Sequence, residues 1–419
     1  MSGIKFKGDT SGEILLETPA VAGTNTLTLP AETGTLATTT EINNVIYKNL
    51  GTRNFIINGD MKIAQRATSV ANVTGGNYYT VDRWQWVKVG SATLDMDQST
   101  DVPAGQGFTN SVKLTVNTAD TAIGATDYSY YRQPIEGNNI AQLEFGNAYA
   151  KTITLSFWVK SSITGTYCAT LHNNDFSRHY IAEYTIDTAD TWEKKTITVV
   201  GDTTGTWATD NTRGLILHFA LATGADYQGS LGWQGDGVKL GSTNQVNWLG
   251  TTGSTLYLTG IQLEAGEEAT PFEHVPVDIS LNRCRRYFLK KYLSHKLVVV
   301  YSNGDTRGHQ EHIGIMRDRP IMSGERLTDL GNNENVSWGV FTQHSLNFSS
   351  AGTKINAPTD SWKLQAIAYE HQYGNVDGTI GKDICLRYGH EGGAIEGYSG
   401  SLNLIAINIV GTVNFDAEL

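Results

Sequence analysis

The histidine pair in GHQEHIG, Gly308–Gly314, is the group of side chains whose types could support metal or acid–base chemistry. His309 and His312 are three residues apart with Glu311 between them, which differs from the HExxH spacing of zinc hydrolases. On a strand or a loop, side chains at that spacing do not share a face, so they do not define a metal site. The pattern favours a surface loop.

A second group of acidic side chains lies in GHEGGAIEG, where Glu391 follows His390 and Glu396 is close by. A glycosidase needs two carboxylates held about 5–10 Å apart on a rigid frame, and this glycine-rich stretch does not fix such a distance. The sequence also has no GxSxG elbow, no Walker loop and no long β-helix repeat. We therefore predict no catalytic residues, with a polysaccharide-degrading enzyme as the alternative.

Aromatic side chains beside polar ones give a better basis for binding, and a sugar is the matching ligand. Sugars present flat C–H faces ringed by hydroxyl groups, and aromatic rings supply large contact areas at low entropic cost. The candidate carbohydrate- or receptor-binding residues are Tyr128, Tyr130, Tyr131, Trp233 and Trp248, and, nearer the C-terminus, Trp338, His371, Tyr373, His390 and Tyr398. For the first set, which we expect to be exposed, an apolar interface between identical chains is the rival explanation.

Charge and cysteine content exclude several other classes of function. The net charge of −11 argues against a nucleic-acid groove, which needs clustered Lys and Arg. The one dense basic run, Arg283–Lys291, is interpreted as a solvated helix face. Cys168, Cys284 and Cys385 are far apart and form no CxxC pair, so neither a zinc cluster nor a disulfide framework is predicted. We expect no metal and no cofactor.

Four segments with a period of two must position these side chains. In Lys151–Lys160, Ile153, Leu155, Phe157 and Val159 alternate with polar residues and Trp158, which is typical of a strand with one face in a core. Similar segments are 194–199, 214–221 and 254–263, and together they predict a β-sandwich. The strand-like surroundings of Trp84, Trp86 and Trp158 predict packing in the core or between sheets.

The C-terminal part is predicted to begin with a helix over residues 278–293. Asp278 is its expected N-cap, and Leu281, Cys284, Phe288 and Tyr292 (or Tyr287) form its apolar stripe. Residues 294–419 then form a second β domain. Its expected strands are 296–301, 339–342, 364–368, 384–388, 402–409 and 413–415.

Residues 1–51 lack the apolar mass for a core of their own and therefore need partners. The segments 4–7, 13–17 and 25–30 are compatible with short strands, and residues 40–50 with a short helix. One face of that helix carries the apolar residues Ile42, Val45, Ile46 and Leu50. This face predicts a three-stranded coil that fixes a homotrimer; a connector helix docked on the sandwich is the alternative.

Two stretches resemble bacteriophage tail-fibre proteins. The first, GDTSGEILLETPAVAGTNTLTLPAETGTLAT at 8–38, is similar to a β-structured segment that precedes the globular tip in a trimeric shaft. The second is the order of motifs from NFIINGDMKIAQR at 54–66 to the closing LEAGEEATPFE at 263–273, with Pro271–Phe272 folding back to seal the sandwich. That order also resembles the jelly-roll carbohydrate-binding modules. The RCRRYF run and the terminal VNFDAEL match the same phage proteins.

The resemblance to sugar-binding modules has one departure. In those modules an NGDFE-type start and an acidic pair in the final strand help to hold a calcium ion. Here Asn58–Asp60 is followed by Met61 and Lys62, and Gly260 and Ile261 stand in place of the acidic pair. Because Ca²⁺ requires six to eight oxygen ligands, we expect no calcium site.

Together these observations predict a four-part, all-β chain: a trimerising β/short-helix stalk (1–51), a jelly-roll β-sandwich (52–277), a bridging helix (278–293) and a C-terminal β-sandwich-like domain at the tip (294–419). The resemblance implies a virion tail fibre or tail-tip protein, assembled in the bacterial cytoplasm as a homotrimer. Its partners would be other tail or baseplate proteins and a glycan or protein receptor on the host surface, but not nucleic acid. A purely architectural fibre or adaptor is a second alternative.

Overall fold

The computed structural model describes the backbone and side chains of residues 53–290 and of Glu418, and further strands by their backbone alone. The chain divides into two compact units, 1–51 and 52–419. In the first unit, β1 (Gly3–Lys7) and β2 (Glu13–Glu17) pair as an antiparallel hairpin, at two of the three strand segments that the sequence predicts. The third segment (25–30), the helix over 40–50 and the trimer-face residues Ile42, Val45, Ile46 and Leu50 lie outside the described residues.

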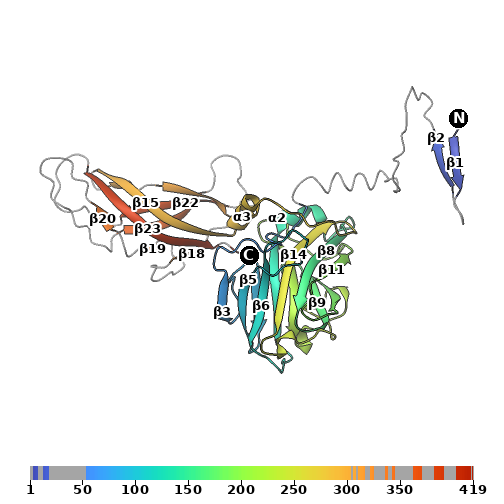
Figure 1. The fold of residues 1–419 in the computed structure, drawn as a ribbon. Helices are drawn as coiled ribbons and strands as arrows, with labels where there is room; N and C mark the ends of the chain where they lie inside the picture. The colour runs from blue at the N-terminus through green and yellow to red at the C-terminus, as the bar shows by residue number, and fades with distance from the viewer. Residues whose placement is uncertain are drawn as a thin grey trace. The chain divides into compact units, whose positions relative to one another are not determined.

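The second unit contains a β-sandwich of two six-stranded antiparallel sheets, which confirms the predicted all-β, jelly-roll class (Figure 1). The first sheet has the order β13 (Gly232–Gln234), β10 (His179–Ile186), β9 (Gly165–His172), β12 (Arg213–Thr223), β7 (Tyr128–Glu136) and β4 (Gln85–Val89). The second has the order β11 (Glu193–Val199), β8 (Ile153–Ser161), β14 (Thr255–Ala265), β6 (Ser111–Thr118), β5 (Thr93–Ser99) and β3 (Ser69–Val73).

Short helical turns connect several of these strands. They are α2 (Gly137–Ile140) and the 3₁₀ turns η1 (Ala141–Leu143), η2 (Ala225–Tyr227) and η3 (Trp248–Gly250). In the described part of the chain, no helix has the length and apolar character needed to cross a lipid bilayer.

The core lies between the two sheets and follows the predicted alternation. In β8, all four apolar residues of the pattern are buried, while Trp158 is half-buried on the outward face. The expectation that Trp158 packs between the sheets is therefore wrong, because its place in the alternation directs it outward. Trp84 and Trp86 are fully buried as predicted, and the Trp84 ring stacks on Tyr131 at 5.4 Å with an interplanar angle of 11°. Each such ring contributes about 1.5–3 kcal/mol or more by leaving water.

The segment after the closing strand β14 folds back along it, as the sequence predicts, and the Glu273 N–H donates to Gln262 Oε1 at 2.8 Å. Phe272 packs edge-on against Phe108, with ring centroids 5.0 Å apart. Gly260 has φ +60°, and a Cβ there would lie 2.5 Å from the Phe108 ring. Only glycine combines that backbone with so close a contact. The Phe108–Phe272 pair therefore depends on Gly260.

The predicted bridging helix is shorter in the structure. Helix α3 spans Val277–Arg285, and strand β15 (Phe288–Ser302) begins three residues later. The expected N-cap, Asp278, lies in the first turn, while Pro276 occupies the N-cap position without a side-chain hydrogen bond. Phe288 and Tyr292 are strand residues because β15 pairs with β23 (Asn403–Asp416) from Phe288 to Tyr301. This long pairing outweighs the local helical pattern.

Two further antiparallel sheets include the C-terminal strands. One has the order β16-β15-β23-β18 with β20 also on β23, and the other has the order β17-β22-β21-β19. The remaining bounds are β16 (Asp305–Arg307), β17 (Gln310–Met316), β18 (Ile321–Gly324), β19 (Val336–Ser337), β20 (Thr342–His344), β21 (Trp362–Tyr369) and β22 (Lys382–His390). The predicted strands at 364–368 and 384–388 fall within β21 and β22, and those at 402–409 and 413–415 merge into β23.

Buried charges join α3 to the sandwich. The carboxylate of Glu136, at the end of β7, accepts hydrogen bonds from Arg286 Nε at 2.9 Å and from the Tyr287 hydroxyl at 2.8 Å. Glu136 is 1% exposed. Burial alone would raise the pKa of this carboxyl, but the Arg286 guanidinium outweighs that effect and lowers it. Glu136 is therefore ionised, and its partners keep the start of β15 against β7.

A second buried ion pair, which we call the C-terminal clasp, holds Glu418 against the sandwich. The Glu418 carboxylate pairs with the fully buried Arg83 guanidinium and lies 3.4 Å from Arg66 Nη2. Arg83 also lies 3.5 Å above the Tyr287 ring, and Arg66 lies 3.6 Å above the Phe288 ring. Arg83 Nη2 donates to the Pro134 carbonyl at 2.7 Å. The clasp therefore covers the same end of β7 as Glu136.

Replacing Glu418 with alanine should lower the free energy of unfolding of the protein by about 3–5 kcal/mol, since it leaves the buried Arg83 charge without its counter-ion. Urea unfolding followed by tryptophan fluorescence would measure the change. Glu268→Ala, at an exposed acidic position, is the control and should shift stability by less than about 0.5 kcal/mol. Equal effects of the two substitutions would contradict the assigned role of the clasp.

Candidate functional site

Strand β7 presents two tyrosines and an arginine on the outward face of the first sheet. Its sequence, YSYYRQPIE, alternates between the two sides, so that Tyr131 enters the core while Tyr128, Tyr130 and Arg132 face outward. Gln85 of β4 is paired with Arg132 in the same register and shares that side. We call the set Tyr128, Tyr130, Arg132, Gln85 and the neighbouring Tyr227 the tyrosine face.

The side chains of the tyrosine face hold one another in place. The rings of Tyr128 and Tyr130 stack with centroids 5.5 Å apart and an interplanar angle of 12°. Tyr227 meets Tyr128 edge-on at 4.8 Å. The Arg132 guanidinium lies 5.8 Å from the Tyr130 ring centroid, and its Nε donates to Gln85 Oε1 at 2.8 Å. The result is a preorganised set of side chains in which Tyr128, Arg132 and Tyr227 are half-buried, while Tyr130 and Gln85 are buried beside them.

The ionisation of the tyrosines suits binding better than catalysis. Burial raises the pKa of Tyr130 to about 12 and also raises the pKa of Tyr128. Both phenols are therefore neutral at physiological pH, when each can donate and accept hydrogen bonds. With neutral phenols beside a permanent cation, the tyrosine face offers stacking and hydrogen bonding without an activated nucleophile.

The rest of the outward face of the first sheet is covered by residues 235–246, which we call the strap. It leaves the edge strand β13 and crosses the neighbouring strands. Over β10, Asp236 Oδ1 lies 3.4 Å from His179 Nε2, and Asn244 Nδ2 donates to Glu183 at 3.1 Å. Over β9, the Ser242 backbone N–H donates to Cys168 Sγ at 3.3 Å. The strap therefore covers most of the outward side of β9, whereas in β10 Glu183 stays half-buried and Thr185 exposed.

Three fully buried histidines lie beneath this cover. His172 lies 4.7 Å from His218 and 5.8 Å from His179, measured between ring centroids. Phe176, from the turn after β9, packs 5.2 Å from His172. The ring nitrogens of all three histidines lack a well-formed hydrogen bond. Among the described residues, no group of three His, Cys, Asp or Glu side chains is arranged to hold a metal ion.

Burial keeps these histidines neutral. It lowers the pKa of His172 to about 3, with a further lowering from His179, and it lowers the pKa of His218 well below its usual value. The pKa of His179 is also lowered by burial, although the Asp236 carboxylate opposes this effect. The cluster is therefore an uncharged part of the outward face that would resist protonation.

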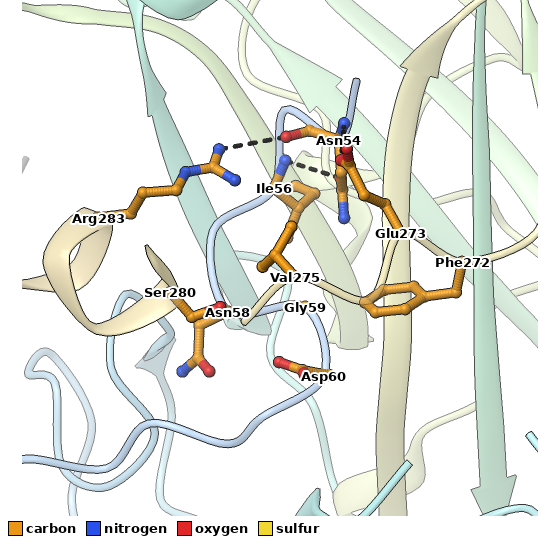
Figure 2. Close-up of a pocket in the computed structure, with 10 residues that line it drawn as sticks. All are labelled: Asn54, Ile56, Asn58, Gly59, Asp60, Phe272, Glu273, Val275, Ser280 and Arg283. Carbon is orange, nitrogen blue, oxygen red and sulfur yellow. Dashed lines mark hydrogen bonds between the residues drawn. The ribbon is translucent and has the colours of Figure 1, made fainter. Parts of the chain in front are cut away.

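A small polar pocket lies where the first residues of the sandwich meet the segment after β14 (Figure 2). The Glu273 carboxylate accepts the backbone N–H of Asn54 at 2.9 Å, and Arg283 Nη2 donates to the Asn54 carbonyl at 3.2 Å. The lining residues are Asn54, Ile56, Asn58, Gly59, Asp60, Phe272, Glu273, Val275, Ser280 and Arg283. These bonds are internal to the protein, and they tie α3 to the start of the sandwich.

The same pocket contains the residues that resemble a calcium-binding start. The buried Asp60 Oδ2 lies 2.9 Å from the ammonium group of Lys62. Asn58 is engaged through its side chain by the Ile63 backbone, donating to its carbonyl and accepting from its N–H, both at 2.9 Å. The positive charge beside Asp60 is therefore supplied by a lysine of the chain itself.

The structure separates the predicted aromatic candidates. Tyr128 and Tyr130 lie together on the tyrosine face. The expected exposure is wrong for Tyr131 and Trp248, which are fully buried in the core because strand alternation and the turn η3 direct them inward. It is also wrong for Tyr130, which faces outward but is only 6% exposed because Tyr128 and His218 pack against its ring. Trp233 is half-buried on the edge strand β13, where its Nε1 donates to the Val200 carbonyl at 2.6 Å.

The C-terminal candidates stay predictions. Trp338, His371, Tyr373 and Tyr398 lie outside the described residues, and so does the side chain of His390, which ends β22. The acidic pair Glu391 and Glu396 also lies outside the described residues. The His309–His312 stretch overlaps β17, whose side chains are not described.

Sequence reasoning did not identify several residues of the site. Arg132 follows Tyr130 by two positions, so strand alternation was the available signal that it belongs to the same face. Gln85 could be assigned only through its pairing with β7, and Tyr227 only through contact with Tyr128. The three histidines come from three different strands, and their meeting depends on sheet order, which no local pattern contains.

The solved structures that the chain resembles include a phage tailspike domain and carbohydrate-binding modules. One is the enzymatically active domain of tailspike protein 4 of bacteriophage CBA120, at 13% identity and a TM-score of 0.29, covering 51% of this chain and 22% of that one. A family 11 carbohydrate-binding module of a Clostridium thermocellum cellulosomal cellulase has 12% identity, a TM-score of 0.26 and coverages of 48% and 95%. TmCBM61, solved with β-1,4-galactotriose, has 10% identity, a TM-score of 0.25 and coverages of 51% and 100%.

No family model and no curated protein matches the chain. The chain spans less than a quarter of the length of the tailspike structure it matches. At TM-scores below 0.5 these likenesses assign no function.

The buried histidines predict that the sandwich loses stability in mild acid. The unfolded chain takes up these protons near pH 6.5, whereas folded His172 takes one up only near pH 3. Stability is therefore full above about pH 6.5 and falls below it by up to about 1.4 kcal/mol per pH unit for each buried histidine. Urea unfolding between pH 7.5 and 5 measures this slope before most carboxylates titrate.

The variant His172→Gln should reduce the pH dependence of the unfolding free energy by the contribution of one buried histidine. It should do so even if it also lowers the unfolding free energy at pH 7.5. His274→Gln, at an exposed position, serves as the reference for removing a surface histidine. An unfolding free energy that is flat between pH 7.5 and 5, or an unchanged slope in His172→Gln, would contradict the assignment.

Proposed function

We propose that this chain is an attachment protein of a bacteriophage virion, a tail fibre or tail-tip protein that binds a glycan on the host surface. The observation that carries the proposal is the tyrosine face, where the half-buried Tyr128 and Arg132 are held on the outward side of the sheet by the buried Tyr130 and Gln85. The tail-fibre resemblance of residues 8–38 and of the sandwich motifs supports the virion context.

The tyrosine face would recognise a sugar by combining two kinds of contact. The half-buried Tyr128 offers apolar ring surface to the C–H face of a pyranose, and Arg132 offers planar N–H donors to its hydroxyl groups. Gln85 and Tyr227 fix the positions of these two side chains. Because the partners are already ordered, little conformational entropy is lost on binding.

Attachment would depend on several copies acting together. A shallow face that offers a few contacts gives weak binding at each site. Three identical sites on one rigid tip raise the effective concentration of the second and third binding events, and so convert weak contacts into durable adhesion. The homotrimer that we infer from the apolar helix face at 40–50 would supply these copies. The net charge of −11 is compatible with a neutral glycan target.

Binding without cleavage is part of the proposal. The tyrosine face contains neutral phenols and a guanidinium, and it lacks the paired carboxylates that glycoside hydrolysis needs. Incubating the protein with host polysaccharide should therefore release no new reducing ends. Their appearance would favour the enzymatic alternative. If the soluble protein neither bound cells nor blocked phage adsorption, the architectural alternative would be favoured.

Arg132→Ala and Tyr128→Ala should each weaken binding of fluorescently labelled protein to host cells by about tenfold or more, because each removes about 1–1.5 kcal/mol of contact per site. Flow cytometry across a protein titration measures the change. Tyr149→Ala is the matched control, since Tyr149 is 78% exposed on a separate loop. Unchanged binding in both face variants would place the receptor contacts elsewhere, with the C-terminal candidates next to be tested.

Val45→Asp together with Ile46→Asp should convert a homotrimer into a monomer, because it puts charge into the predicted apolar seam. Native mass spectrometry reads the oligomeric state directly. Asn44→Asp, on the opposite side of the predicted helix, should leave the trimer intact. A monomeric wild-type protein would remove the basis for avidity, whereas a trimer that survives the double substitution would contradict the assigned seam.

A further inference from the structure

We propose that residues 235–239, at the start of the strap, form a lid that opens in mild acid and admits protons to His172 and His179. The proposal does not depend on the function proposed above. It rests on the few bonds that hold the lid, on the buried imidazoles without partners beneath it, and on the strained turn beside it.

The lid is anchored at both ends and held weakly between them. Before it, β13 is paired with β10. After it, the buried Leu240 donates its N–H to the Tyr227 carbonyl at 2.7 Å. Residues 235–239 themselves make no backbone-to-backbone hydrogen bond within the described part of the chain. Residues 235–238 are exposed, and Gly237 has φ +103°, a conformation that glycine adopts without strain. Segments of this kind open at the lowest cost.

Two side chains tether the lid to the rest of the sandwich. Lys239 Nζ donates to the Asp226 carbonyl at 2.9 Å. The Asp236 carboxylate lies 3.4 Å from His179 Nε2, although the Asp236 side chain is 61% exposed. Contacts of charged groups at the surface contribute little to stability. Opening the lid therefore breaks few interactions.

The imidazoles beneath the lid lack partners. His172 and His179 are opposite each other on β9 and β10, and both side chains are fully buried. The Lys239 backbone lies beside His172 and the Gly237 backbone lies beside His179, but neither ring has a well-formed hydrogen bond. A buried polar group without a partner has lost its hydration and gained no bond in return. Opening the lid restores that hydration.

The charges around the histidines disfavour protonation while the lid is closed. Besides the histidines themselves, the charged and titratable side chains that face the cluster are Asp236, Arg132, Arg178, Arg213, Lys239 and Tyr130. Four of these are cations, which oppose a proton on a nearby imidazole. Asp236 is the carboxylate of the set, and it belongs to the lid. A proton on His172 is therefore poorly tolerated in the closed arrangement.

The turn beside the lid, residues 173–178 between β9 and β10, carries backbone strain. Phe176 in this turn has φ +58°, which a bulky residue rarely adopts. Its ring packs 5.2 Å from His172 and 6.3 Å from His218, measured between ring centroids. Such strain persists only where the surroundings hold it in place. Because a protonated His172 is better solvated by water than by an aromatic ring, its protonation would loosen this packing as well.

Proton uptake couples the lid to pH. A histidine in water takes up a proton near pH 6.5, whereas a buried one takes it up only at lower pH. Below pH 6.5 the open arrangement therefore binds more protons than the closed one, and the ratio of open to closed molecules rises as the pH falls. Between pH 7.5 and 5.5 the rise is about tenfold for each histidine that opening exposes.

Acylation by diethyl pyrocarbonate would measure lid opening in the full-length protein. The reagent attacks neutral imidazole nitrogens that reach solvent, and mass spectrometry of the digested protein gives the rate at each histidine. The exposed His274 corrects for the change of reactivity with pH. The rate at His172 relative to His274 should rise about tenfold or more from pH 7.5 to 5.5. An unchanged ratio would overturn the proposal.

Amide hydrogen exchange of β14 distinguishes lid opening from unfolding of the whole sandwich. β14 lies inside the second sheet, between β8 and β6, and makes no contact with the lid that opening would break. Its amides should stay protected at pH 5.5 after correction for the intrinsic exchange rate. A loss of protection in β14 that matches the rise at His172 would assign the exposure to global unfolding and overturn the lid.

Two surface variants test the contribution of Asp236. Asp236→Asn removes the carboxylate that favours a proton on His179 in the closed arrangement. The rate ratio of His172 at pH 5.5 should then exceed the wild-type ratio by about threefold, with less than about twofold change at pH 7.5. Asp226→Asn removes an exposed carboxylate of η2 and should match the wild type. Equal ratios in the two variants at pH 5.5 would contradict the coupling of the lid to His179.

Discussion

Strand β7 has to satisfy two environments at once, and the rest of the molecule depends on that requirement. On one side Tyr131 stacks on Trp84 in the core; on the other, the half-buried Tyr128 stacks on Tyr130, which is 6% exposed. A slip of one residue would exchange the two sets, leaving core aromatic rings in water and placing Arg132 in the core. The cost of burying that charge makes the register strongly specified. The geometry of the tyrosine face is therefore a consequence of core packing.

Buried ion pairs provide a second constraint at the end of the same strand. Burial alone would lower the pKa of Arg83, but the Glu418 carboxylate outweighs it and raises the pKa. Such a pair contributes little net stability compared with an apolar replacement, yet breaking it is expensive. What the pair provides is a unique arrangement, since a misplaced C-terminal end would leave Arg83 unpaired. The clasp thus fixes the position of Glu418 on the sandwich.

The sequence predicted those parts of the molecule that local periodicity determines. The segments 151–160, 194–199, 214–221 and 254–263 all became strands, because alternation along a strand is written into neighbouring residues. The helix over 278–293 was predicted to be too long. Residues 288–301 instead pair with β23, which lies more than 100 residues further along the chain. The exposure of Trp248 was misjudged for the same kind of reason: a Gly- and Asn-rich neighbourhood resembles a surface loop, but η3 packs into the core.

The site was predicted in part, and the missing part is informative. The sequence identifies Tyr128 and Tyr130 as aromatic residues in a polar setting. It does not identify the strap, because the strap reaches the sheet only through tertiary packing. That cover also carries a cost, since it buries three histidines whose nitrogens lack well-formed partners. A sandwich that needed only stability would place apolar residues beneath the strap. The polar character of the covered strands and the tyrosine face therefore belong to one continuous outward side of the sheet, of which the strap covers the β9–β10 end.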